Sequence, residues 1–287
     1  EGPPHAAILG VHGFNDFSTA FAAAAGSWAA AGVVVYSFDQ RGFGAADAPG
    51  IWPGAATMVD DLADVAAAVV ERHPALPVYV VGVSMGGAVA MVGLADRRLP
   101  GIAGTVLVGP AVWARETMPL SHRAGLWLAA RTVPWLRLGG RGLGIRPSDN
   151  VEMLRALGAD PLIVKETRVD AMQGVVDLMD RAYAAAPAVV EPVLLLYGAN
   201  DEIIPREPTG STVCRRGGPW RVGVYPNGWH MLLRDRQAEV VHTDILAWID
   251  DPAVPLPSGA EEEARRFFAC PGEQDTGVAG VFGSEPQ

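Results

Sequence analysis

The sequence predicts an α/β protein with a doubly wound, mainly parallel sheet and a helical cap insertion. Short runs of β-branched and aliphatic residues alternate with longer Ala-rich segments, as in parallel strands joined by helical crossovers. The alternation stops between residues 111 and 187 and then resumes. A Gly-x-Ser-x-Gly sequence also stands between a strand-like run and the Ala-rich segment after it, which is typical of a tight strand-to-helix turn.

Six strands are expected, each a short apolar run bounded by turn residues. They lie at residues 6–11, 33–38, 78–83, 105–108, 193–197 and 221–225. The helices are expected around residues 20–30, 58–72, 86–94 and 238–249. Strands that are connected through helices run parallel, so this order implies one open sheet with helices on both faces.

The chain is expected to divide into four segments. Residues 1–110 and 188–250 form the two parts of the α/β core. Residues 111–187 form the cap, which shows helical periodicity and no convincing strand. Residues 251–287 are rich in Pro, Gly, Glu and Ser, which predicts a largely disordered or weakly helical tail without catalytic groups.

The composition limits the classes of function. With 49% hydrophobic and 19% charged residues in a chain of 287, a hydrophobic core is expected. The formal net charge of −10 disfavours nucleic acid as a partner, and it disfavours docking onto anionic membranes through charge. No stretch of about 18 apolar residues is present, so no transmembrane helix is expected.

The two cysteines, Cys214 and Cys270, are too few for a disulfide framework or a zinc site, and they form no Cys-x-x-Cys pair. They favour a reduced, intracellular protein. A basic segment followed by an apolar one, the pattern of a targeting peptide, does not precede the first strand. A cytoplasmic location is therefore expected, and no pattern indicates an oligomeric state.

Ser84 is the predicted nucleophile. It is the central residue of the sequence Gly-Val-Ser-Met-Gly at 82–86, between the strand at 78–83 and the helix at 86–94. A tight turn exposes the hydroxyl there, and the flanking residues are small because a Cβ would collide with the neighbouring strand or helix. The start of the helix also favours the negative charge that develops in acyl transfer.

The predicted base is His230. A serine hydroxyl is a weak nucleophile at neutral pH and needs a base within hydrogen-bond reach. Among six histidines His230 is best placed, because it follows the last strand on a loop that contains glycine. His12 is the main competitor, but it opens the loop after the first strand, where it also fits a structural role.

The predicted orienting acid is Asp201, which lies just after the strand at 193–197. Functional groups converge at this edge of a parallel sheet. The order of nucleophile, acid and histidine along the chain is also the one expected for such a sheet. Glu202 and Asp39 are the alternatives, although Asp39 fits a capping role near Arg41.

Two backbone N–H groups are expected to stabilise the oxyanion of a tetrahedral intermediate. One belongs to Met85, the residue after the nucleophile. The other is assigned to Phe14, in the loop after the first strand, where Gly13 lets the backbone approach the substrate.

The chain resembles the α/β-hydrolases and, among them, the group of monoacylglycerol lipases and lysophospholipases, which are hydrolases of the serine aminopeptidase type. The matching segments lie at residues 12–14, 39–44, 83–87, 198–201 and 229–233. The resemblance implies hydrolysis of a single-chain lipid ester, a monoacylglycerol or a lysophospholipid, through an acyl-enzyme on Ser84. It implies no metal and no organic cofactor. It also implies a mobile cap that admits the acyl chain and contacts the membrane transiently.

The cap holds an unusual concentration of large apolar side chains. Five are predicted to bind substrate by lining an acyl-chain pocket: Trp113, Met118, Trp127, Met172 and Met179. The alternative is that they form the cap's own core and its contact with the sheet.

Two features depart from the resemblance. The family's sheet begins with two further strands, which the five residues before residue 6 cannot supply. Three explanations are open: the chain is a fragment, it begins after processing, or its sheet has an uncovered edge at the strand 33–38. The segment 209–219 is rich in Gly and Arg where a helix is usual, so different packing behind Asp201 is expected.

Other functions compete for the same residues. A serine aminopeptidase needs acidic cap groups that bind a substrate ammonium. The candidates are Glu116, Glu152, Glu166 and Asp170, for which surface solvation is an equally good explanation. A cofactor-free haloperoxidase or perhydrolase reaction is an alternative side activity. The complete Ser, Asp and His set disfavours a non-catalytic ligand-binding module, and the serine disfavours epoxide hydrolases and dehalogenases, which use an aspartate nucleophile.

Overall fold

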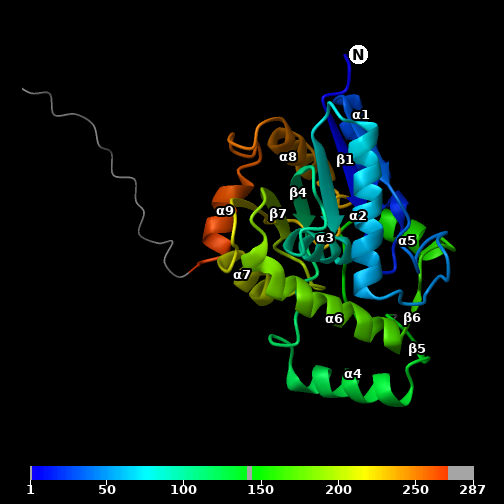
Figure 1. Ribbon diagram of the computed structural model, residues 1–287. Coiled ribbons are helices and arrows are strands. Elements are labelled where there is room, and N and C mark those ends of the chain that lie inside the picture. Colours follow the sequence, from blue (N-terminus) through cyan, green and yellow to red (C-terminus); the bar gives the residue numbers. More distant parts are fainter. Residues whose placement is uncertain (1, 141–143, 271–287) are drawn as a thin grey trace, which may run out of the picture.

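The computed structural model describes residues 2–140 and 144–270, in which a six-stranded parallel sheet forms the centre (Figure 1). Neighbouring strands follow the order β2-β1-β3-β4-β7-β8, so β2 is an edge strand. Their bounds are β1 Ala6–Val11, β2 Val33–Ser37, β3 Val78–Val83, β4 Ile102–Val108, β7 Val193–Gly198 and β8 Trp220–Tyr225. All six expected strands are present, and their parallel pairing confirms the predicted fold class.

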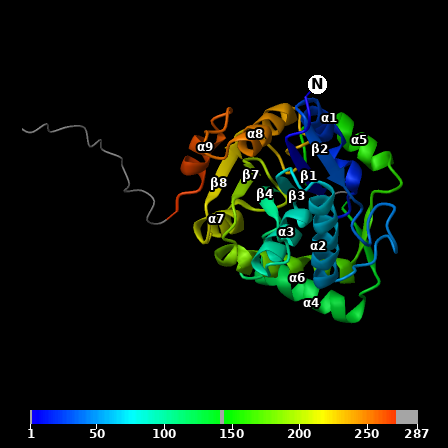
Figure 2. The same ribbon diagram turned by 45° about the horizontal axis from the view of Figure 1, so that its top comes forward.

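Helices cover both faces of the sheet (Figure 2). One face packs against α1 (Ala22–Ala30) and α8 (Ala238–Asp250). The other packs against α2 (Ala55–Arg72), α3 (Met85–Ala95) and α6 (Val169–Ala185). A sheet buried on both faces explains why its strands read as continuous apolar runs rather than as alternating patterns.

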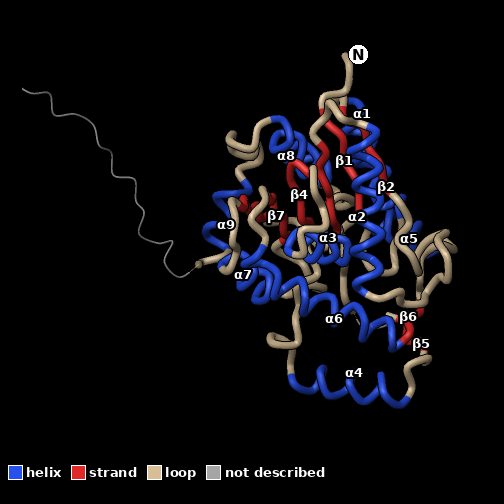
Figure 3. Tube along the Cα trace, in the orientation of Figure 1, coloured by secondary structure: helices blue, strands red, loops and turns tan. Residues whose placement is uncertain are grey.

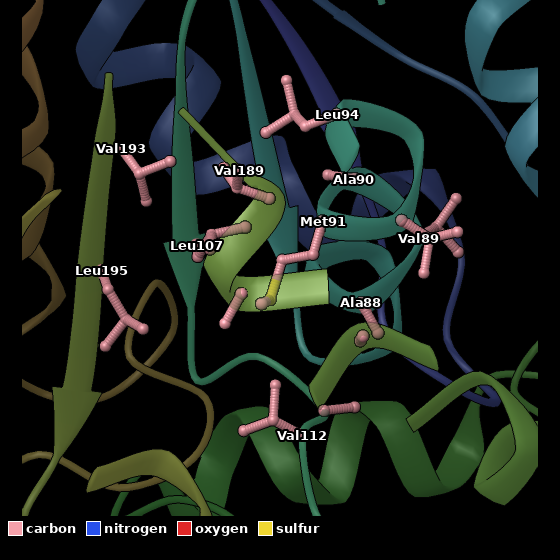
Figure 4. Close-up of a cluster of buried hydrophobic side chains, with 14 of the residues drawn as sticks. Ala88, Val89, Ala90, Met91, Leu94, Leu107, Val112, Val189, Val193 and Leu195 are labelled. Atoms are coloured by element: carbon pink, nitrogen blue, oxygen red, sulfur yellow. The ribbon is translucent and has the colours of Figure 1, made fainter. Parts of the chain in front are cut away.

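Helix α3 is surrounded by the core. Ala88 and Met91 of α3 lie among Leu107 of β4 and Leu195 of β7, and all four side chains are buried (Figure 4). Residues 85–94 of α3 are buried on every side of the helix, as expected for an element inside a hydrophobic core. The helix that begins directly after Ser84 is therefore fixed by packing on its whole circumference.

The strand register brings the loops of the predicted site to one edge of the sheet. Val11 at the end of β1 lies opposite Gly82 of β3, and Gly198 at the end of β7 lies opposite Tyr225 at the end of β8. The loops after these strands therefore leave the sheet on the same side, where ligands bind in open α/β sheets.

The chain between β4 and β7 carries helices and one small antiparallel pair of strands in the part that the structure describes (Figure 3). Besides α6, its elements are α4 (Leu120–Thr132), α5 (Val151–Ala159) and the antiparallel strands β5 (Arg137–Gly139) and β6 (Glu166–Arg168). The expectation of no strand in this segment is wrong. Strands of three residues are too short to show an alternating pattern, and all of β5 is exposed.

The two long cap helices pack differently. Helix α6 buries residues such as Leu178 and Ala182 in the main core and contacts α3. Helix α4 has no buried residue and lies outside α6 (Figure 1). Of the helices that the structure describes, none is long and apolar enough to cross a membrane.

The chain after α8 contains a further helix, α9 (Ala260–Phe267), so of the two expectations for this tail, disorder and weak helix, the first does not hold for these residues. Helix α9 contacts β8, and Ala264 and Phe268 join the hydrophobic core. Because the helix carries three consecutive glutamates and two arginines, the sequence gives little indication that any of its residues are buried. The predicted disorder of residues 271–287 concerns a segment outside the described residues.

Cys214 and Cys270 form a disulfide, so the expectation of reduced cysteines is wrong. The bond joins the end of α7 (Arg206–Cys214) to the residues that follow α9. Helix α7 includes residues 209–214 of the segment 209–219, where the Gly and Arg content predicted a departure from the usual helix. The cysteines are 56 positions apart, and two isolated cysteines carry no sequence signal for their pairing.

Candidate active site

Ser84 occupies a strained turn between β3 and α3. Its backbone has φ 51° and ψ −113°, a conformation that costs a non-glycine residue about 1–3 kcal/mol. Its N–H donates to the Val108 carbonyl at 2.9 Å, and its own carbonyl accepts from the N–H groups of Ala88 at 3.1 Å and Ala111 at 2.9 Å. Three backbone hydrogen bonds and the buried α3 hold the turn in this conformation.

Two glycines permit the turn because backbone lies against them. A Cβ on Gly86 would lie 2.1 Å from the Val11 carbonyl oxygen, and a Cβ on Gly82 would lie 2.7 Å from backbone atoms of Gly87. Real Cβ contacts of this length do not occur. The small flanking residues of the motif are therefore required by close approach of β1 and α3, as the sequence predicts.

Asp201 and His230 form a buried hydrogen-bonded pair. Oδ2 of Asp201 accepts from Nδ1 of His230 at 2.7 Å, and the side chains are 0% and 6% exposed. Oδ1 of Asp201 accepts from the N–H groups of Ile203 at 2.8 Å and Ile204 at 2.9 Å. Both carboxylate oxygens are thus held, and a neutral imidazole that donates through Nδ1 keeps its lone pair on Nε2.

The alternative acids have other partners. Asp39 accepts from the N–H groups of Ser18 at 2.8 Å and Ala45 at 2.7 Å, so it holds its own loop. Glu202 is exposed and accepts from the Arg146 N–H at 2.6 Å. Of the three carboxyl groups considered from the sequence, Asp201 is the one that contacts His230.

The end of β4 brings Ser84 close to this pair. Val108 accepts the Ser84 N–H, and the next residue, Gly109, lies beside the pair. A Cβ on Gly109 would lie 3.4 Å from Nδ1 of His230 and 3.5 Å from Oδ2 of Asp201. Among the hydrogen bonds of the described residues none joins the Ser84 hydroxyl to His230, and such bonds are often long before substrate binds.

His12 supports the loop that faces Ser84. Its Nε2 accepts from the Gln40 N–H at 2.9 Å, so Nδ1 carries the proton and donates to the Gly13 carbonyl at 2.8 Å. Burial lowers the pKa of His12 below its ordinary value, which keeps the ring neutral. A Cβ on Gly13 would lie 3.4 Å from Cβ of Ser84, so this loop passes directly over the nucleophile.

Phe14, a predicted oxyanion donor, follows in the same loop. Its ring makes edge contacts with Phe43 at 5.6 Å and Trp52 at 6.2 Å between ring centres. Met85, the other predicted donor, begins α3, where the first N–H groups of a helix have no partner within the helix. Met85 thus follows Ser84 directly in the chain, and Phe14 follows Gly13, which lies against Ser84.

The five predicted substrate residues do not share one environment. Trp113 and Met179 are partly buried and pack against the main core, as in the alternative that they form the seam of the cap. Met118 and Met172 are half-buried. Trp127 is 55% exposed on α4, where it lines a cavity of about 360 Å³ together with Gln173 of α6. A role in substrate binding stays a prediction for all five.

Trp52 is a site residue that the sequence interpretation missed. Its ring fills the space in front of Gly174 of α6, where a Cβ would lie 2.3 Å from Cδ1 of the indole, and it makes an edge contact with the Phe14 ring. Trp52 therefore links the loop over the nucleophile to the inner cap helix. It stands in a loop rich in Gly and Pro outside the recognised motifs, so its only signal was its size.

No metal centre is formed by the residues described: within 2–140 and 144–270, no group of three or more His, Cys, Asp or Glu side chains is arranged to hold an ion.

Comparison with known protein families gives the family of the chain. A family model described as serine aminopeptidase, S33, matches residues 2–237. The chain belongs to this family. The match includes Ser84, Asp201 and His230 of this S33 hydrolase and ends before α8.

The proteins to which this S33 hydrolase is similar include lipases. A monoacylglycerol lipase of Mycolicibacterium smegmatis is 26% identical over 260 residues, which are 86% of this chain and 88% of the relative. A monoglyceride lipase of Homo sapiens is 28% identical over 209 residues, which are 70% of this chain and 67% of the relative. The solved monoacylglycerol lipase of Paleococcus ferrophilus has a TM-score of 0.73 at 23% identity and covers 86% of this chain and 95% of that chain. These likenesses confirm the α/β-hydrolase fold and the predicted resemblance.

Proposed function

We propose that the protein is a serine carboxylester hydrolase that cleaves single-chain lipid esters, monoacylglycerols or lysophospholipids. One observation carries the proposal: a buried Asp201–His230 pair, joined at 2.7 Å, lies beside the strained turn of Ser84. Two of the relatives are named as lipases that act on monoglycerides, which supports the substrate class.

In the proposed reaction Oγ of Ser84 attacks the ester carbonyl while Nε2 of His230 takes its proton. Asp201 keeps the imidazole in the tautomer that can accept this proton and stabilises the imidazolium. The N–H groups of Phe14 and Met85 donate to the oxyanion. His230 then gives the proton to the leaving alcohol, and the same steps with water release the fatty acid from Ser84.

A contact between α4 and a lipid surface completes the proposal. Leu120 and Leu128 are 74% and 56% exposed on α4, although most residues of their size are buried elsewhere in the protein. Residues 117–148 contain arginines and no Asp or Glu, in a chain of net charge −10. Apolar side chains flanked by arginine suit the interface of a membrane, from which the substrate would be drawn.

An aminopeptidase reaction is the competing proposal, since the family description names that activity. It needs an uncompensated carboxylate in the cap. Asp170 is paired with Arg168, and this hydrogen bond lowers the pKa of Asp170. Glu116, Glu152 and Glu166 are exposed. Because no carboxylate of this set is buried and unpaired, ester hydrolysis is favoured.

The proposal is tested by labelling with a fluorophosphonate and by turnover. One label per chain, absent in Ser84→Ala and retained in the exposed control Ser37→Ala, is expected. Rates on p-nitrophenyl esters are expected to favour medium or long acyl chains, with hydrolysis of monoolein or lysophosphatidylcholine. Best turnover of acetate would contradict the lipid substrate, and hydrolysis of aminoacyl p-nitroanilides in preference to esters would favour the aminopeptidase.

The surface contact has its own test. Leu128→Asp is expected to slow hydrolysis of monoolein in vesicles and to leave the rate on a soluble short-chain ester unchanged. Equal loss on both substrates would contradict a role in surface contact.

A further inference from the structure

A short cap segment, residues 146–150, is bound to both loops that carry the proposed acid and base. We name it the strap. Next to the acid, the Arg146 N–H donates to Oε2 of Glu202 at 2.6 Å. Next to the base, the Arg146 guanidinium lies 4.6 Å from the ring centre of Trp229, and the Pro147 carbonyl accepts from the Met231 N–H at 3.0 Å.

The strap continues along the loop after His230. Oδ1 of Asp149 accepts from the Arg236 N–H at 2.9 Å. Nδ2 of Asn150 donates to the Arg234 carbonyl at 3.0 Å, while Oδ1 of Asn150 accepts from Met153 and caps α5. The strap therefore contacts the loop between Trp229 and Arg236 at several points, and it is anchored at its far end by a helix.

Asp235 lies at the centre of these contacts. Its side chain is buried, with 3% of the residue exposed. Oδ1 accepts from the buried Ser148 hydroxyl of the strap at 2.6 Å, and Oδ2 accepts from the N–H of Trp229 at 2.8 Å. Trp229 immediately precedes His230, so one carboxylate joins the strap to the backbone on which the imidazole stands.

We propose that Asp235 is a positioning residue for His230, and that Ser148 of the strap holds its carboxylate in place. The inference rests on the proposed function, in which His230 is the base. Without the carboxylate, the Trp229 N–H loses its acceptor and the loop loses its bond to Ser148 of the strap. The imidazole then leaves the geometry in which it meets Asp201, and a displacement of about 1 Å lowers turnover by about 100-fold.

The proposal predicts a separation of kcat from KM. Asp235→Ala is expected to lower kcat by about 100-fold with KM unchanged, and Ser148→Ala to lower it less because the carboxylate keeps the Trp229 N–H. Asp235→Asn is expected to recover most of the loss, since its amide oxygen can accept from Trp229 and its NH₂ can donate to Ser148. A role in stability alone would not give rescue in kcat by this variant.

Ser258→Ala is the matched control. Ser258 also bonds a buried aspartate, Asp244, but that pair joins α8 to the segment before α9, away from His230. The control is expected to lower the melting temperature and to leave kcat unchanged. If Ser148→Ala behaves as Ser258→Ala does, or if Asp235→Asn is as impaired as Asp235→Ala, the proposal is wrong.

A readout that needs no turnover separates this inference from the proposed function. The Nδ1 proton of His230 is expected to give a low-field proton resonance in the wild type, because it is bonded to a buried carboxylate. The resonance is expected to be lost in Asp235→Ala and kept in Asp235→Asn and Ser258→Ala. Loss of the signal in a protein that hydrolyses no ester would support the positioning role and refute the esterase; a signal unchanged in Asp235→Ala would refute the positioning role.

Discussion

His230 donates through Nδ1 to Oδ2 of Asp201 although the residues are 29 positions apart in the chain. The contact follows from the sheet, because β7 and β8 are parallel neighbours and Gly198 lies opposite Tyr225. Each partner then needs only a few residues beyond its strand to reach the other. A parallel sheet thus brings together groups that no local sequence pattern connects.

Replacing the carboxylate of Asp201 tests this relationship. Asp201→Asn is expected to lower kcat by about 10⁴-fold, because the amide can donate to Nδ1 and favour the tautomer with its proton on Nε2. The measurement is turnover of a soluble ester together with the melting temperature. Glu207→Gln, at an exposed position in the first turn of α7, is the control and is expected to retain full activity. Unchanged turnover in Asp201→Asn would exclude Asp201 as the orienting acid.

The close approach at the nucleophile turn makes a second prediction. Gly86→Ala is expected to lower the free energy of unfolding by about 1–3 kcal/mol and to lower activity, because its Cβ meets backbone of β1 that cannot move. Gly26→Ala in α1 is the matched control, since nothing lies within 4 Å of its Cβ position. Alanine favours helix by about 1 kcal/mol, so the control should gain stability. Urea denaturation decides, and equal effects of the two changes would contradict the packing described.

The disulfide predicts a large dependence of stability on redox state. The bond between Cys214 and Cys270 closes a loop of 56 positions, and a cross-link of that span stabilises by about 4 kcal/mol through the unfolded chain. Cys214→Ser is expected to lower the free energy of unfolding by that amount, and a reductant should affect the wild type but not the variant. Two free thiols in the denatured, unreduced wild type would contradict the bond.

The same bond bears on the expected location. Disulfides persist in oxidising environments and are rare in the reducing cytosol. The expectation of a cytoplasmic protein rested in part on unpaired cysteines, and it loses that part of its support.

Buried histidine predicts a loss of stability in acid. Burial lowers the pKa of His242 from its ordinary value of 6.5, so below that pH the unfolded chain binds a proton that the folded protein does not. The stabilisation is present above 6.5 and is lost as the pH falls through the lowered pKa; His12 acts in the same direction. His242→Gln should reduce the difference in unfolding free energy between pH 7.5 and pH 5.5, whereas Val241→Ala, at a buried position without charge, should leave it unchanged. A difference unaltered in His242→Gln would refute this.

The strands and the residues that end them could be predicted because both signals are local. β1 and β3 have the bounds that the sequence predicts, since strands buried on both faces are apolar at every position. Ser84, Asp201 and His230 each follow such a run within a few residues. What the sequence could not show are contacts between distant segments.

The missed features share this origin. In the sequence Asp235 is one of many charged loop residues, and its role depends on the hydrogen bond from Ser148 of the cap, which only the structure shows. The pairing of Cys214 with Cys270 and the burial of Phe268 likewise depend on partners far along the chain. Tertiary packing determines these features, and local sequence propensity gives no signal for any of them.

The separation of Ser84 along the chain from the loops that carry Asp201 and His230 has a consequence during translation. The serine and the loop over it belong to the first part of the chain, whereas Asp201 and His230 follow β7 and β8. A ribosome-bound chain that ends before β7 carries the alcohol but neither of the groups that would activate it. Under the proposed function, the newly made polypeptide therefore cannot attack esters until β8 and the loop that carries His230 have been synthesised.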